Sequence, residues 1–152
     1  MTVSFERSHD ILIDAPPGAV LDYVSNPKSW PAWIAASHHI ESADRPLALG
    51  ETFREKWHIR SGEVWLDWVV TRAEPDRLWE VEAMTGFIGK IIVRYTCARL
   101  GGRTKYTRTI INPSRPKLPT AEMIQRIDEE AGIALRNIKA NVEERAAGSS
   151  VA

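Results

Sequence analysis

Residues 64–72 read Val-Trp-Leu-Asp-Trp-Val-Val-Thr-Arg, and this stretch decides the fold class because its polarity changes with a period of two. In a β-strand, successive side chains point to opposite faces of the sheet. One face of this stretch carries Val64, Leu66, Trp68, Val70 and Arg72, and the other carries Trp65, Asp67, Val69 and Thr71. We therefore expect a half-buried antiparallel strand with the first of these faces turned inward.

The chain on both sides of this stretch has the same character. Between His38 and Ile111, short alternating segments are separated by turn signals such as Arg45-Pro46, Glu74-Pro75-Asp76 and Gly101-Gly102. This spacing predicts about six antiparallel strands, and residues 5–13 predict one more at the N-terminus. The same two-residue period turns Phe53, Glu55, Trp57, Trp79, Val81, Tyr95 and Cys97 inward.

Helical patterns flank the strands. Pro16-Pro17-Gly18 ends the first strand and opens a short helix, and a second short helix is expected over residues 28–35. Residues 112–119 hold three prolines and predict a stiff connector that is neither strand nor helix. From Thr120 to about Arg145, apolar residues recur every three or four positions, which predicts a long amphipathic helix. The order of elements indicates the α+β class.

Composition limits the class of protein. A chain of 152 residues is expected to form one domain, over residues 1–146, followed by a frayed tail over residues 147–152. Twenty Lys and Arg residues balance twenty Asp and Glu residues, so we expect no nucleic-acid partner. No apolar run approaches the length of a membrane span. A single cysteine, Cys97, favours a reducing, cytoplasmic compartment. The expected oligomeric state is a monomer or a homodimer.

A family resemblance follows from an ordered set of motifs. These are Ile13-Asp14-Ala15-Pro16-Pro17-Gly18-Ala19-Val20, Trp30-Pro31 followed by Trp33, Gly101-Gly102 followed by Thr104, and the long C-terminal helix. The set resembles the START-like (SRPBCC, Bet v 1-like) superfamily over nearly the whole chain. The resemblance implies a helix-grip fold, in which a curved, antiparallel, seven-stranded sheet wraps around the C-terminal helix and two short helices follow the first strand.

A narrower similarity lies in residues 64–72, together with Pro75-Asp76, Thr85-Gly86-Phe87 and Asn137-Ile138-Lys139. These segments look like the aromatase/cyclase branch of polyketide biosynthesis. In that branch an arginine of this strand is thought to hold a ketone of the substrate beside a pocket tryptophan. Arg72 and Trp68 match these two positions, and Trp30 matches a further pocket tryptophan. The chain departs from the branch at Val70, where the branch has serine, and at Ser37, where it has tyrosine.

Two residues are candidates for catalysis. Arg72 could stabilise the charge of an enolate or alkoxide, because a guanidinium stays charged and offers several donors; it could equally be a strand-end arginine that reaches solvent. Glu55 has an inward position, where an unpaired carboxylate is costly to bury. It could be a proton carrier, or it could form a structural pair with Arg72 or Arg108.

The expected ligand-binding residues are inward aromatic side chains and their neighbours, namely Trp30, Trp57, Trp68, Val70, Trp79, Tyr95 and Arg108. No cofactor and no metal are expected. His38 and His39 are adjacent, so in a strand they point to opposite faces and cannot share an ion, and the other histidines are isolated.

The first functional hypothesis is therefore a protein that binds a hydrophobic aromatic or polyketide-like molecule in an internal cavity, with aldol cyclisation and aromatisation as the reaction that the resemblance implies. The alternative is a non-catalytic carrier or sensor of a hydrophobic ligand such as a quinone or lipid. A third class is a protein-binding module of the Hsp90-activator type. It would need an exposed apolar sheet face, whereas the outer positions here are charged, for example Arg54, Lys56 and Asp67.

Overall fold

The computed structural model describes residues 2–34, 39–59 and 62–149. Its elements follow in the order β1 (Val3–Ile13), α1 (Pro17–Val24), the 3-10 helix η1 (Pro27–Ala32), β2 (His39–Glu41), β3 (Thr52–Ile59), β4 (Gly62–Glu74), β5 (Leu78–Thr85), β6 (Gly89–Leu100), β7 (Arg103–Arg115) and α2 (Ala121–Ser149). The strands form one antiparallel sheet in the order β1-β7-β6-β5-β4-β3-β2. The predicted helix-grip fold is confirmed.

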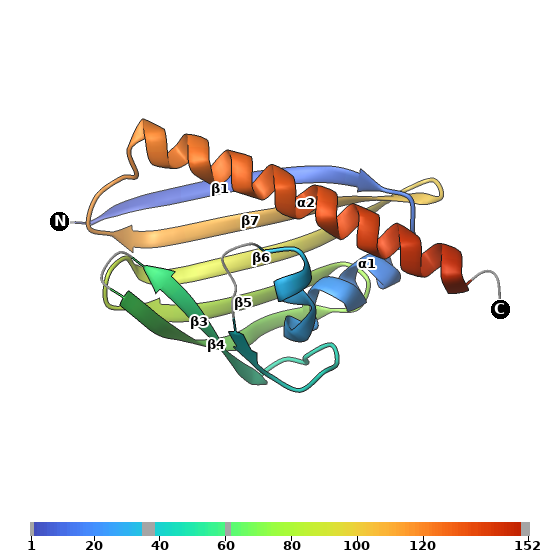
Figure 1. Ribbon diagram of the computed structural model, residues 1–152, viewed down its shortest axis with the longest axis horizontal. Coiled ribbons are helices and arrows are strands. Elements are labelled where there is room, and N and C mark those ends of the chain that lie inside the picture. Colours follow the sequence, from blue (N-terminus) through green and yellow to red (C-terminus); the bar gives the residue numbers. More distant parts are fainter. Residues whose placement is uncertain (1, 35–38, 60–61, 150–152) are drawn as a thin grey trace.

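The sheet curves around the long helix. In Figure 1, α2 runs obliquely across β1 and β7 and ends beside α1. The short helices α1 and η1 lie near the C-terminal half of α2 and at the same end of the sheet. Phe53, Trp68, Val81 and Val93, from four neighbouring strands, are almost completely buried, so the core lies between the concave face of the sheet and the helices.

Local sequence sets the ends of the short helices. Pro17 occupies the first turn of α1, where its missing N–H costs nothing. The Asn26 side chain accepts a hydrogen bond from the Lys28 backbone N–H at 3.1 Å and so caps η1. The Thr104 hydroxyl donates to the Ala15 carbonyl at 2.7 Å, which ties the end of β1 to β7. The predicted second helix over residues 28–35 is shorter, since η1 ends at Ala32.

The prediction that residues 112–119 contain no strand is wrong for its first part. Strand β7 continues to Arg115 and includes Pro113. Arg115 pairs with Val3 and Asn112 pairs with Phe5, so β7 holds one more residue than β1 between these pairs, as in a β-bulge. The ladder between β6 and β7 ends at the pair Ile92 and Ile111. Pro113 therefore falls at a bulge beyond the paired part of β6, where proline is tolerated.

The two halves of α2 pack differently. Ala134, Leu135, Ile138 and Val142 in the second half are buried, whereas no side chain of residues 121–133 is fully buried. The helix continues to Ser149, past the predicted start of the tail at Ala147. No helix in the described ranges combines the length and apolar character that crossing a membrane requires.

Candidate functional site

Arg72 lies outside the interior of the protein. Along β4, Val70 pairs with Val81 of β5, but the next pair joins Arg72 to Glu80, so Thr71 is an extra residue. Because side chains alternate along a strand, this bulge reverses the face of the residues that follow it. The Arg72 side chain is 50% exposed, and its Nη2 lies 3.3 Å from Glu74 Oε2. The prediction that Arg72 shares the inner face with Trp68 is therefore wrong.

The inward aromatic side chains pack around Trp30. Its ring centroid lies 5.2 Å from that of Phe53, 6.2 Å from that of Trp68 and 6.4 Å from that of Trp79. The Trp30 indole N–H donates to the Val24 carbonyl at 3.0 Å. Since buried indole N–H groups need partners, this bond accounts for the buried position of Trp30 beside α1.

A cavity of about 360 Å³ lies between the sheet and the first half of α2. Its lining comprises Phe5, Trp30, Trp33, Ile34, Glu55, Trp57, His58, Trp68, Ile88, Ile91, Val93, Arg108, Ile110, Asn112, Arg115, Ile127, Glu130, Ala131, Ile133 and Ala134. The cavity explains why residues 121–133 contain no fully buried side chain, since the inner side of this part of α2 faces the cavity.

The structure brings together five of the predicted site residues. Trp30, Glu55, Trp57, Trp68 and Arg108 all line the cavity. These residues come from η1 and from strands β3, β4 and β7.

The other predicted ligand-binding residues, Val70, Trp79 and Tyr95, are not part of its lining but are buried in the core. The Trp79 indole N–H donates to the Leu47 carbonyl at 2.9 Å, and the Trp79 and Tyr95 rings lie 5.3 Å apart. These contacts give both side chains a structural environment away from the cavity wall.

Sequence reasoning missed several lining residues. Trp33 is only 1% exposed and lines the cavity, although it is not among the predicted ligand-binding residues. Ile127, Ala131 and Ala134 belong to the apolar face of the predicted amphipathic helix, and they line the cavity. Their spacing of three and four residues predicts that they share one face of the helix, but it does not show that a cavity lies beneath that face. Ser37 and His38 lie outside the described residues.

Charged and polar groups are present in this mostly apolar cavity. The Glu55 side chain is 1% exposed and accepts a hydrogen bond from Trp68 Nε1 at 3.1 Å. The Arg108 guanidinium carbon lies 5.9 Å from the centroid of the Trp33 ring and 5.6 Å from that of Tyr95. These distances place the cation within the range of favourable contact with aromatic rings.

Behind the cavity wall lie two buried phenols. The hydroxyl groups of Tyr95 and Tyr106, like Arg108 Nε, have no hydrogen-bond partner among the described residues. Burial, only partly offset by the Arg108 charge, raises the pKa of Tyr95, and burial raises that of Tyr106 further. Both phenols therefore stay protonated at neutral pH and can donate a hydrogen bond.

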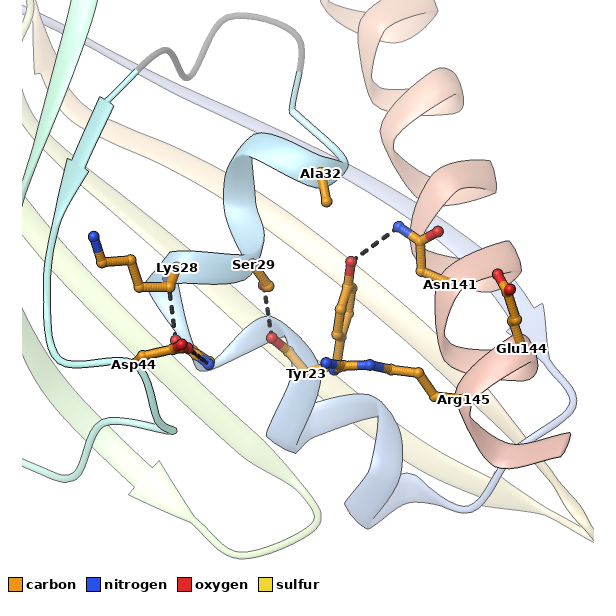
Figure 2. Close-up of a pocket in the computed structure, with 9 residues that line it drawn as sticks. Tyr23, Lys28, Ser29, Ala32, Asp44, Asn141, Glu144 and Arg145 are labelled. Carbon is orange, nitrogen blue, oxygen red and sulfur yellow. Dashed lines mark hydrogen bonds between the residues drawn. The ribbon is translucent and has the colours of Figure 1, made fainter. Parts of the chain in front are cut away.

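A second hollow is a polar groove of about 470 Å³ between α1, η1 and the C-terminal half of α2. Figure 2 shows the Tyr23 hydroxyl turned towards Asn141 of α2, whose amide donates to it at 2.9 Å. The Arg145 guanidinium carbon lies 5.0 Å from the centroid of the Tyr23 ring. The Ser29 hydroxyl donates to the Tyr23 carbonyl at 2.8 Å. These contacts join α2 to the short helices, and none of the predicted site residues lies in this groove.

The fold and the cavity define a helix-grip protein with an internal, tryptophan-lined pocket. Comparison with known families then gives the assignment. Residues 2–143 match the family described as polyketide cyclase / dehydrase and lipid transport, and the chain belongs to this family.

The chain is also similar to individual proteins. The chain is 28% identical over 117 residues to penitrem biosynthesis cluster 1 protein I of Penicillium ochrochloron. The aligned part covers 72% of this chain and 76% of that protein. Among solved structures it is similar to the Zhui aromatase/cyclase of Streptomyces sp. R1128, with a TM-score of 0.74 and 14% identity over 94% of this chain and 96% of that one. The Aha1 dimer of Colwellia psychrerythraea gives a TM-score of 0.67 and 15% identity over 91% and 96% of the two chains. At these identities the two structures show a shared fold.

Proposed function

We propose that this protein binds a hydrophobic, aromatic or polyketide-like small molecule in the cavity beneath the first half of α2. The observation that carries the proposal is the cavity itself, which combines the rings of Trp30, Trp33, Trp57 and Trp68 with the charged groups of Glu55 and Arg108. Small-molecule sites are typically concave and apolar with a few polar groups that orient the ligand. A volume of about 360 Å³ is near the small end of such sites and favours a compact ligand of a few rings.

Aldol cyclisation is the reaction that the site residues would support. The Glu55 carboxylate would accept a proton from a carbon between two ligand carbonyl groups, which leaves an enolate. The enolate carbon would attack a second carbonyl carbon of the same molecule, forming a C–C bond and an alkoxide that takes up a proton. Loss of water would then give the unsaturated ring. The role of carbonyl anchor moves from Arg72 to Arg108, because Arg108 lines the cavity and Arg72 does not.

The second candidate is a non-catalytic carrier of a hydrophobic ligand. The family description covers lipid transport as well as cyclases, and Val70 stands where the aromatase/cyclase branch has a hydrogen-bonding serine. A carrier would release its ligand unaltered, so product analysis after incubation separates the two candidates.

A protein-binding role on the sheet receives less support. The outer face of the sheet carries cross-strand ion pairs, with Arg54 Nε 2.8 Å from Asp67 Oδ1 and Arg94 Nε 2.8 Å from Glu80 Oε1. A charged face of this kind does not offer the contiguous apolar patch that a sticky docking surface needs.

Ligand binding can be tested by blocking the cavity. Ala131 lines the cavity, so Ala131→Trp should fill part of it, whereas Glu129→Trp adds the same side chain at an exposed position of the same helix. We expect an anthraquinone to quench the tryptophan fluorescence of the parent and of Glu129→Trp but not to bind Ala131→Trp. Equal binding to both variants would place the ligand elsewhere and refute the proposal.

A further inference from the structure

Arg108 is a buried cation that lines the cavity. It lies on β7 directly opposite Tyr95 of β6. Its Nε atom is buried without a hydrogen-bond partner, and the guanidinium lies close enough to the Tyr95 hydroxyl and to the Glu55 carboxylate to interact with both. Burial of a cation is costly, and contact with the Trp33 and Tyr95 rings offsets only part of the cost. A ligand group of opposite charge would offset the remaining cost, so the position favours ligand binding.

The groups around Arg108 define the chemistry of the site. The buried Tyr95 and Tyr106 hydroxyls from β6 and β7 lie near the cation, and both can donate a hydrogen bond. The Glu55 carboxylate from β3 attracts it electrostatically. The remaining titratable or charged lining groups are His58 of β3, Arg115 of β7 and Glu130 of α2. Of the two arginines, Arg115 is already engaged, because its Nε donates to the Lys117 carbonyl at 3.0 Å.

We propose that Arg108 binds an oxygen of the ligand that carries negative charge, so that the cavity selects acidic phenols and enolised 1,3-dicarbonyl compounds over neutral hydrocarbons and lipid chains. This proposal rests on the proposed function and names its ligand class. A guanidinium edge presents two parallel N–H donors, which match two neighbouring oxygens such as those of an enolised 1,3-diketone or a hydroxyquinone. The indole walls suit the flat carbon skeleton of such a ligand, and a hydrocarbon would leave the donors unused.

The test uses two probes of the same shape. One is a hydroxyanthraquinone, whose absorption band moves to longer wavelength when the hydroxyl group ionises, and the other is anthraquinone without a hydroxyl group. We expect the parent protein to lower the pKa of the bound hydroxyanthraquinone by about one unit or more, since a nearby opposite charge favours the ionised form. In Arg108→Met this shift should disappear and the affinity for this probe should fall about tenfold or more, while the affinity for anthraquinone stays within about twofold.

Arg72→Met is the matched control, because it removes the same side chain from the exposed outer position on β4. It should keep both the pKa shift and the affinity of the parent. Thermal unfolding supplies an independent measurement: Arg108→Met should be as stable as the parent or more stable, since replacing the buried cation by an apolar side chain removes its desolvation cost. A purely structural arginine would instead lower the melting temperature when replaced.

The outcomes separate the two proposals. If both probes bind the parent with no pKa shift, or if Arg108→Met keeps the shift, the role of Arg108 is wrong while the ligand-binding function stands. If neither probe binds the parent, the proposed function fails and the inference about Arg108 fails with it.

Discussion

The Trp68 indole N–H donates to Glu55 Oε1 at 3.1 Å, and both side chains are at most 2% exposed. The two residues lie on neighbouring strands, where Phe53 pairs with Trp68 and Glu55 pairs with Leu66. The bond fixes one oxygen of the carboxylate at the cavity wall. Glu55 is thus a positioned acceptor in the same cavity as Arg108.

Replacement of Glu55 should separate its structural and chemical roles. Glu55→Gln keeps an oxygen that can accept from Trp68, so we expect it to fold and bind an anthraquinone as the parent does. Any cyclisation activity should fall about a hundredfold or more, because an amide cannot take up the proton. Glu55→Leu leaves the Trp68 N–H without this acceptor and should lower the free energy of unfolding by about 1–3 kcal/mol relative to Glu55→Gln. Unfolding in urea and product analysis measure these effects; full activity of Glu55→Gln would refute the proton-carrier role.

Trp30 should be the most important tryptophan for stability. It lies at the centre of the aromatic cluster and donates to the Val24 carbonyl, so Trp30→Ala should cost about 3–5 kcal/mol of unfolding free energy. The control is Trp65→Ala, because Trp65 lies on the outer face, where the Arg54 guanidinium carbon is 4.5 Å from its ring centroid. Its loss should cost about 1 kcal/mol or less, which reflects a cation–π contact at the protein surface. Similar losses for both variants in denaturant unfolding would contradict the central position of Trp30.

Cys97 should react slowly in the folded protein. Burial raises the pKa of its thiol from 9.0 to about 12, which lowers the thiolate fraction at pH 8 about a thousandfold. We expect alkylation by iodoacetamide to be slower by roughly this factor in the native protein than in urea-unfolded protein. Mass spectrometry of timed samples gives the two rates, and equal rates would mean that the thiol is accessible in the native state.

The first half of α2 should be held on the sheet by Asp128. Its carboxylate accepts from Arg7 Nε at 2.9 Å and lies 2.7 Å from His9 Nε2 on β1. The hydrogen bond from Arg7 and that from His9 lower the pKa of Asp128 well below its usual range. The stabilisation is therefore complete above the normal pKa of an aspartate and is lost as the pH falls towards the lowered value.

Asp128→Asn should remove this pH dependence and speed amide hydrogen exchange in residues 121–133, where no side chain is fully buried. Exchange around Leu135 and Ile138 should change little, because these side chains are buried in the core. Glu129→Gln, a neighbouring exposed change, should leave the exchange pattern unaltered. Uniform exchange along α2 in the parent and in Asp128→Asn would show that the ion pair does not hold this half of the helix.

Much of the architecture could be predicted from local sequence. The two-residue period in β4 placed Leu66 and Trp68 inside and Trp65 outside, and the structure agrees because strand geometry alone sets this alternation. The inward position of Glu55 followed from the same rule. The apolar stripe of the C-terminal helix likewise predicted a helix that packs on one side.

The contents of the cavity were decided by tertiary structure. The extra residue at Thr71 turns Arg72 to the outer face of the sheet. Such a bulge depends on how two strands pair, and the pattern of a single strand gives no information on that pairing. The two-residue period turns both Trp57 and Trp79 inward, but of these two only Trp57 lines the cavity. The path of α2 over the sheet determines which inward side chains pack against helices and which line the cavity. The sheet, the long helix and the aromatic interior could be predicted from the sequence alone, because they follow from local periodicity. The packing of α2 and the register of strand pairing determined that Arg108 lines the cavity and that Arg72 does not.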